Sequence, residues 1–171
     1  MTTELEQLTR HMAWADATIW RTVVGADATA ADARIRGLLH HLHTVQWVYL
    51  QLLRGESLDV PGEEAFTDAE ALWRWASDYH REAPGFLAGL DEGALDAHVE
   101  MPWAERLAER YGAVHPVTVR QALLQVASHS TYHRGQVNTR IREVGGEPPL
   151  TDFVAWVWIG RPPPEWPEPR A

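Results

Sequence analysis

Four segments of this chain carry apolar residues at every third or fourth position, a spacing that lines one side of an α-helix. They span residues 4 to 24, 31 to 54, 67 to 90 and 117 to 144. Little between them has the alternation of a strand. Because amphipathic helices of this length bury their apolar sides against one another, the pattern predicts an all-α four-helix bundle.

The end of the chain differs in composition from the four segments. Pro148 and Pro149 prevent the fourth helix from continuing, and residues 153 to 159 suit a short C-terminal helix. The last stretch, residues 161 to 171, holds five prolines and is expected to be extended or disordered. We therefore expect one domain over residues 1 to 160, followed by a proline-rich tail.

Charge and composition narrow the range of partners. The chain has 15 Lys and Arg against 24 Asp and Glu, a net charge of −9, which argues against nucleic acid as the main partner. No apolar run approaches the ~20 residues that cross a bilayer, and the first residues lack the pattern of a signal peptide. We expect a cytoplasmic protein without a membrane partner. Because the chain has no cysteine, any metal must rely on His, Asp, Glu or water, and any thiol must come from another molecule.

The fourth segment contains His129 and His133, which are four residues apart and so share one side of a helix. At helical spacing they align with Ala122, Val126 and Val137, so we expect them in or beside the buried stripe. A buried imidazole pair must be satisfied by hydrogen bonds or by a metal ion. Both alternatives remain open at this point: two core histidines, or two ligands of one metal.

A third histidine for such a site would come from the second segment. His41 and His43 lie on opposite shoulders of its apolar stripe, and the periodicity does not choose between them. We expect at least one of the two to be interior. Bundles commonly hold metals in the core between facing helices, so either histidine could complete a group of three.

These residues resemble the DinB-like superfamily, which includes the YfiT-type metal hydrolases and thiol-dependent transferases. The resemblance spans nearly the whole chain and depends on five stretches: Leu8 to Asp16, Leu39-His-His41-Leu, Tyr49 to Gly55, His129-x-x-x-His133-Arg-Gly-Gln136, and Gly145-Gly-Glu-Pro-Pro with Thr151-Asp-Phe. Many relatives have a second histidine directly before the last ligand, where this chain has Tyr132.

The resemblance implies a bundle with an up-down-down-up course, often dimeric, that binds one divalent metal through three histidines. Carried onto this sequence, the ligands are His41, His129 and His133, with His43 as the alternative to His41. Zn²⁺ and Ni²⁺ are the first candidates, although imidazole also suits iron and copper. Tyr49 and Gln136 are candidates for lining a pocket at the site.

Three neutral imidazoles leave a divalent ion with open positions, as in catalytic sites. We therefore expect a metal-dependent enzyme that transfers a low-molecular-weight thiol to a small electrophile, or that hydrolyses a small substrate. The alternative is a stress-related bundle that binds metal and dimerises without turnover. For Arg134, beside a ligand histidine, we favour a structural ion pair over a role in binding substrate.

Overall fold

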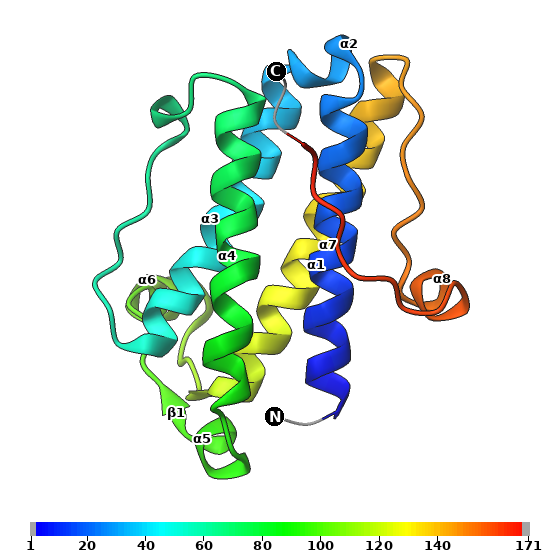
Figure 1. Cartoon of the computed structure of the whole chain (residues 1–171). Helices are drawn as coiled ribbons and strands as arrows, with labels where there is room; N and C mark the ends of the chain where they lie inside the picture. Colours follow the sequence, from blue (N-terminus) through cyan, green and yellow to red (C-terminus); the bar gives the residue numbers. More distant parts are fainter. Residues whose placement is uncertain (1–2, 169–171) are drawn as a thin grey trace.

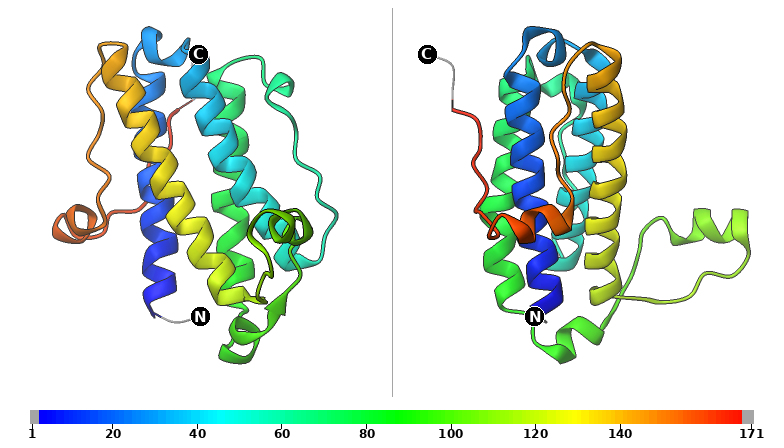
Figure 2. Two further views of the ribbon diagram at one scale, coloured as in Figure 1. Left: turned by 180° about the vertical axis from the view of Figure 1, so that it is seen from behind. Right: turned by 90° about the vertical axis from the view of Figure 1, so that its right-hand side faces the viewer.

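The computed structural model describes residues 3 to 168. Four long helices form a bundle: α1 (Thr3–Val24), α3 (Ala33–Arg54), α4 (Ala69–Ala88) and α7 (Val119–Glu143). Two of them, α1 and α7, run in one direction, and α3 and α4 run in the other (Figures 1 and 2). The all-α bundle is confirmed, with the up-down-down-up course that the resemblance implied.

Short elements connect and follow the long helices. They are, in chain order, α2 (Asp27–Ala30), the 3₁₀ turn η1 (Glu63–Ala65), α5 (Glu92–Asp96), β1 (His98–Val99), α6 (Ala104–Tyr111), β2 (Val117–Thr118) and α8 (Phe153–Trp158). The two strands pair antiparallel at the base of α7. The expected short C-terminal helix is thus present as α8.

Side chains and glycines fix the ends of the long helices. Asp32 and Asp68 each accept a hydrogen bond from a backbone N–H in the first turn of α3 and α4. Thr118 and Gln121 form a reciprocal capping box at the start of α7. The end of α3 has Gly55 at φ 70°, a left-handed conformation that favours glycine. Each cap satisfies backbone groups that a helix end leaves without partners.

The packing of the four helices gives the bundle two opposite edges. α7 packs against α3 and α1, and α4 packs against the same two helices from the other side. The α3–α7 edge therefore lies across the bundle from the α1–α4 edge. Figure 2 shows α3 and α7 in front when the molecule is seen from behind, whereas Figure 1 shows α1 and α4 in front.

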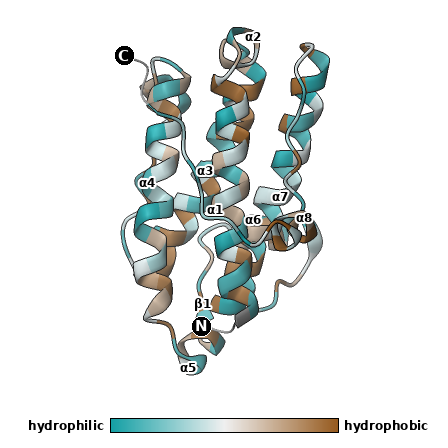
Figure 3. Ribbon diagram, turned by 45° about the vertical axis from the view of Figure 1, so that its right-hand side comes forward, coloured by the Kyte–Doolittle hydropathy of each residue, from teal (hydrophilic) through white to brown (hydrophobic). Residues whose placement is uncertain are grey.

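The core is built from the apolar sides of all four helices. Hydrophobic and hydrophilic residues recur in turn along each helix (Figure 3). The largest fully buried apolar side chains are Trp20, Trp156, Ile19, Ile35, Leu39, Leu42, Leu72, Leu95 and Ile141. Trp156 brings α8 into this packing by contacting Trp14 and Ala15 of α1.

The described part of the tail, residues 161 to 168, has no helix or strand and lies along the bundle (Figure 1). Its Glu165 pairs with Arg21 of α1. The ring of Trp166 packs against the core cluster and lies 5.4 Å from the ring of His80. The tail was expected to be extended or disordered, and its residues 161 to 168 are extended. Residues 169 to 171 of the predicted tail fall outside the described residues.

Candidate metal centre

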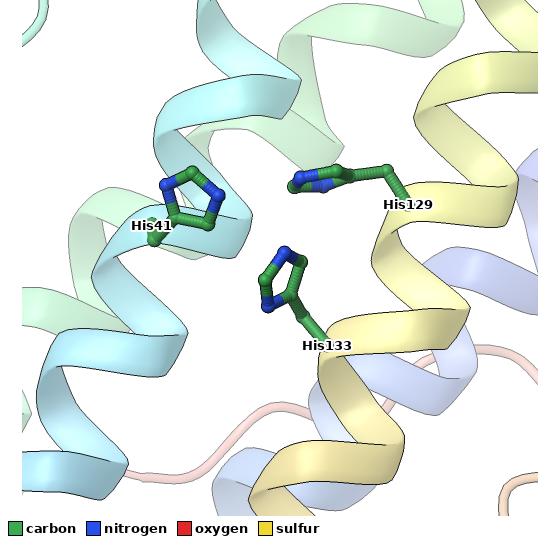
Figure 4. A group of neighbouring side chains, drawn as sticks. All are labelled: His41, His129 and His133. Carbon is green, nitrogen blue, oxygen red and sulfur yellow. The ribbon is translucent and has the colours of Figure 1, made fainter.

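Three histidines from two helices meet at the α3–α7 edge. α3 contributes His41, and α7 contributes His129 and His133 one turn apart (Figure 4). Their ring centroids are 5.1 Å apart for His41 and His129, 4.7 Å for His41 and His133, and 4.3 Å for His129 and His133. Each ring offers one nitrogen that lies within 4.8 Å of the other two, so this group, here called the histidine triad, could hold a metal ion.

The triad lies at the edge of the core and is open to solvent on one side. His41 is exposed, and the other two histidines are half-buried. Burial lowers the pKa of His41, and the neighbouring His133 lowers it further. For His129 burial and the other two histidines lower the pKa to about 4. These two imidazoles are therefore neutral at pH 7, the form in which a ring nitrogen can bind a metal.

The lack of hydrogen-bond partners at two of the histidines also favours a metal ion at the triad. The Nδ1 atoms of His129 and His133 are buried, and neither has a hydrogen-bond partner among the described residues. An unpartnered buried nitrogen is unfavourable, so these rings are not ordinary core histidines held by neighbouring side chains. A metal shared by the triad would satisfy one nitrogen of each ring.

The buried stripe of α7 contains Ala122, Val126 and Val137, and it also runs through Ser130 and Arg134. His129 and His133 are half-buried and lie beside this stripe, which is one of the two placements expected for them. The burial of Ser130 and Arg134 was not expected. A second polar group inside the bundle gives both side chains buried partners.

That second group, here called the interior network, centres on Asp16 of α1. Its carboxylate accepts hydrogen bonds from Arg134 at 2.7 Å, from Gln46 at 2.7 Å and from His80 at 3.0 Å. Burial alone would raise the pKa of Asp16, but Arg134 and His80 hold it far below its usual value. Arg134 is thus a structural ion-pair partner, as its position beside a histidine of the triad led us to expect. In the sequence, Asp16 ends the Leu8-to-Asp16 stretch that carries the resemblance, but no role was expected for it.

His43 belongs to the interior network and not to the triad. It is fully buried, and its Nε2 accepts a hydrogen bond of 2.9 Å from Trp20 Nε1. Its Nδ1 donates one of 2.8 Å to Gln46 Oε1. Although Asp16, His43 and His80 lie close enough to form a metal-binding group, both nitrogens of His43 are already used. The structure therefore brings His41, rather than His43, next to His129 and His133.

Comparison with known proteins agrees with this arrangement. The model of the DinB family matches residues 1 to 165, nearly the whole chain. The chain belongs to the DinB family. A comparison with functionally curated proteins gave no significant match. None of the helices over residues 3 to 168 is long and apolar enough to cross a membrane.

Two further residues of this DinB-family protein were expected to line a pocket at the triad. Tyr49 lies two turns beyond His41 on α3, where it is half-buried and its ring is 5.6 Å from that of Trp103. Burial raises the pKa of its phenol. Gln136 lies one turn beyond His133, and its buried Oε1 has no hydrogen-bond partner in the described part of the chain. This amide oxygen is free to accept a bond from a ligand or from a histidine N–H.

Proposed function

We propose that this DinB-family protein binds one divalent metal, Zn²⁺ or Ni²⁺ as first candidates, through His41, His129 and His133. The observation that carries the proposal is the convergence of three imidazoles, one exposed and two half-buried, at the α3–α7 edge. Two of the three have lowered pKa values, and two have buried nitrogens without partners. Ring nitrogens with these properties are suited to binding a metal ion.

We further propose that the site is catalytic and transfers a low-molecular-weight thiol to a small electrophile. A divalent ion with only three neutral protein ligands keeps Lewis acidity and an open position at which a thiol is bound as the thiolate. Because the chain has no cysteine, the thiol must come from solution. Cofactors of the bacillithiol and mycothiol type fit this requirement.

The proposed thiol transfer needs no oxidant or reductant. The thiol sulfur forms a bond to the electrophilic carbon, the leaving group departs with the electron pair of the broken bond, and the thiol proton passes to solvent. The protein's part is to orient the two reactants at the triad. Gln136 offers an unpartnered amide oxygen for this, and Tyr49 offers a phenol whose pKa is raised by burial. Hydrolysis of a small substrate at the same histidines is the related reaction.

The alternative is a bundle that binds metal and dimerises without catalysis. One observation favours an association surface on such a bundle. A group of apolar side chains around α8 is exposed, with 66% of Leu150, 49% of Val154, 79% of Trp158 and 62% of Ile159 accessible to solvent. Exposed apolar groups of this kind mark association surfaces. We propose that this surface forms a homodimer, which light scattering would show; a monomer at all concentrations would contradict it.

The catalytic proposal is tested with the metal-loaded protein, bacillithiol or mycothiol, and 1-chloro-2,4-dinitrobenzene as electrophile. We expect thiol consumption and chloride release well above the uncatalysed rate. Both should be lost in His133→Ala and kept in His115→Ala, which removes an exposed histidine outside the triad. Protein that holds metal but shows no rate above background with either thiol, or with hydrolase substrates, would leave the non-catalytic alternative.

A further inference from the structure

A cavity lies on the side of the bundle opposite the histidine triad. It has a volume of about 630 Å³ and lies between the first half of α1, the second half of α4 and the tail. Ligand sites in proteins commonly have volumes of ~300–1,000 Å³. Nothing in the histidine triad borders this cavity, so it is separate from the proposed metal site.

The walls of the cavity are mainly apolar. α1 contributes Ala13, α4 contributes Leu87 and Ala88, and the tail contributes the consecutive prolines 162 to 164. The tail is held in place there because Trp156 Nε1 donates a hydrogen bond of 3.0 Å to the carbonyl of Pro162. Such walls favour a ligand with an apolar body.

One buried polar side chain reaches the cavity. His80 lines it, although only 3% of its side chain is exposed. Its Nε2 donates a hydrogen bond of 3.0 Å to Asp16, which fixes the ring at the cavity wall. The imidazole thus adds a polar group to a lining that is otherwise mainly apolar.

A free cation also borders the cavity. Arg10 of α1 lines it and makes no ion pair or hydrogen bond within the described part of the chain. Glu6 lies one turn earlier and lines the cavity too, but it belongs to the first turn of α1, where the helix dipole already stabilises a negative charge. The guanidinium of Arg10 is thus the charge that lacks a counterion.

We propose that this cavity binds a small amphipathic carboxylate, with the apolar body between α1, α4 and the prolines and the carboxylate at Arg10. A guanidinium pairs with a carboxylate through two parallel hydrogen bonds, which an amine or an alcohol cannot replace. The site takes its ligand independently of the histidine triad.

The experiment is isothermal titration of the full chain with decanoate, and with decylamine and 1-decanol as matched ligands of the same length. We expect about one decanoate per chain, bound at least about tenfold more tightly than either matched ligand. Saturable binding that is absent, or equal for all three ligands, would overturn the proposal.

Two variants separate the cavity from the rest of the surface. Arg10→Gln removes the cation and Ala88→Trp fills the cavity, and both positions are exposed, so the fold should be kept. We expect decanoate binding to weaken by about tenfold or more in each. Arg106→Gln, which removes an exposed cation that does not line the cavity, should not weaken it. Full binding in both Arg10→Gln and Ala88→Trp would overturn the proposal.

Discussion

Neighbouring residues on α7 have opposite surroundings because each step along an α-helix turns the side chain by about 100°. His129 and His133 are half-buried at the α3–α7 edge, whereas Ser130 and Arg134 are buried in the interior. There the guanidinium of Arg134 meets Asp16, and both side chains are almost fully buried. A charge in such a place is tolerated only when its partner is present.

We therefore predict that Arg134→Met destabilises the protein by about 3–5 kcal/mol, because Asp16 would stay buried without its main counter-charge. Urea unfolding of both proteins measures this. In the double variant with Asp16→Asn the loss should be smaller than the sum of the two single losses, since no charge remains unpaired. Additive losses, or a loss below about 1 kcal/mol for Arg134→Met, would show that the pair contributes little.

The interior network also predicts how stability depends on pH. Burial lowers the pKa of His43 to about 4 from its usual 6.5. Between these values the unfolded chain binds a proton that the folded protein excludes, so the free energy of unfolding falls as pH is lowered from 6.5 to 4. His43→Gln should reduce this dependence, and His115→Gln should leave it unchanged. The measurement is urea unfolding of the metal-free proteins across this range; the same slope in His43→Gln would contradict the assignment.

The helical periodicity of the sequence did not decide whether His41 or His43 lies beside His129 and His133. It placed them on opposite shoulders of one stripe, and the interior partner that holds His43 is Gln46 joined to Asp16 of α1. A single-helix pattern cannot show a contact between helices that lie far apart in sequence. For the same reason it missed that Ser130 and Arg134 lie on the buried side of α7.

At the scale of elements, the long helices were predictable because their ends carry local signals. Asp68, Thr118 and Gly55 act as caps whose chemistry is visible in the sequence. Pro84 lies inside α4, and the helix continues through it. The short α2 was missed, because one turn of helix has no periodicity to read.

One cap has a second role that local pattern does not reveal. Asp32 caps α3 by accepting a bond from Ile35 N, and it also accepts hydrogen bonds from Arg140 of α7, the shortest of them 2.8 Å. We predict that Asp32→Ala loses the cap, at about 1 kcal/mol, together with the pairing, whereas Asp32→Asn keeps the cap. Thermal unfolding should rank wild type above Asp32→Asn and Asp32→Ala lowest. Equal stability of the two variants would contradict the capping role.

At the scale of the whole molecule, the bundle separates two sites on opposite edges with the interior network between them. The triad lies at the α3–α7 edge, and the cavity lies at the α1–α4 edge under the tail. The family match extends to residue 165 and so includes part of the tail. Residues 161 to 168, the part of the tail that the structure describes, contact the bundle through Glu165 and Trp166.

The packing of the tail can be tested with two tryptophans that differ in their surroundings. Trp166 contacts the core cluster, whereas Trp158 is 79% exposed. We predict that Trp166→Ala lowers the free energy of unfolding by about 1–2 kcal/mol through lost apolar burial. Trp158→Ala should change it by less than about 0.5 kcal/mol. Chemical denaturation decides this, and equal effects would show that the tail adds no stability.

The most direct test of the metal site is metal content by elemental mass spectrometry after reconstitution with Zn²⁺ or Ni²⁺. We expect about one metal per chain in the wild type and in His115→Ala, and almost none in His41→Ala or His133→Ala. A wild-type chain that holds no metal, or a His133→Ala chain that holds as much as the wild type, would contradict the assignment of His41, His129 and His133 as the ligands.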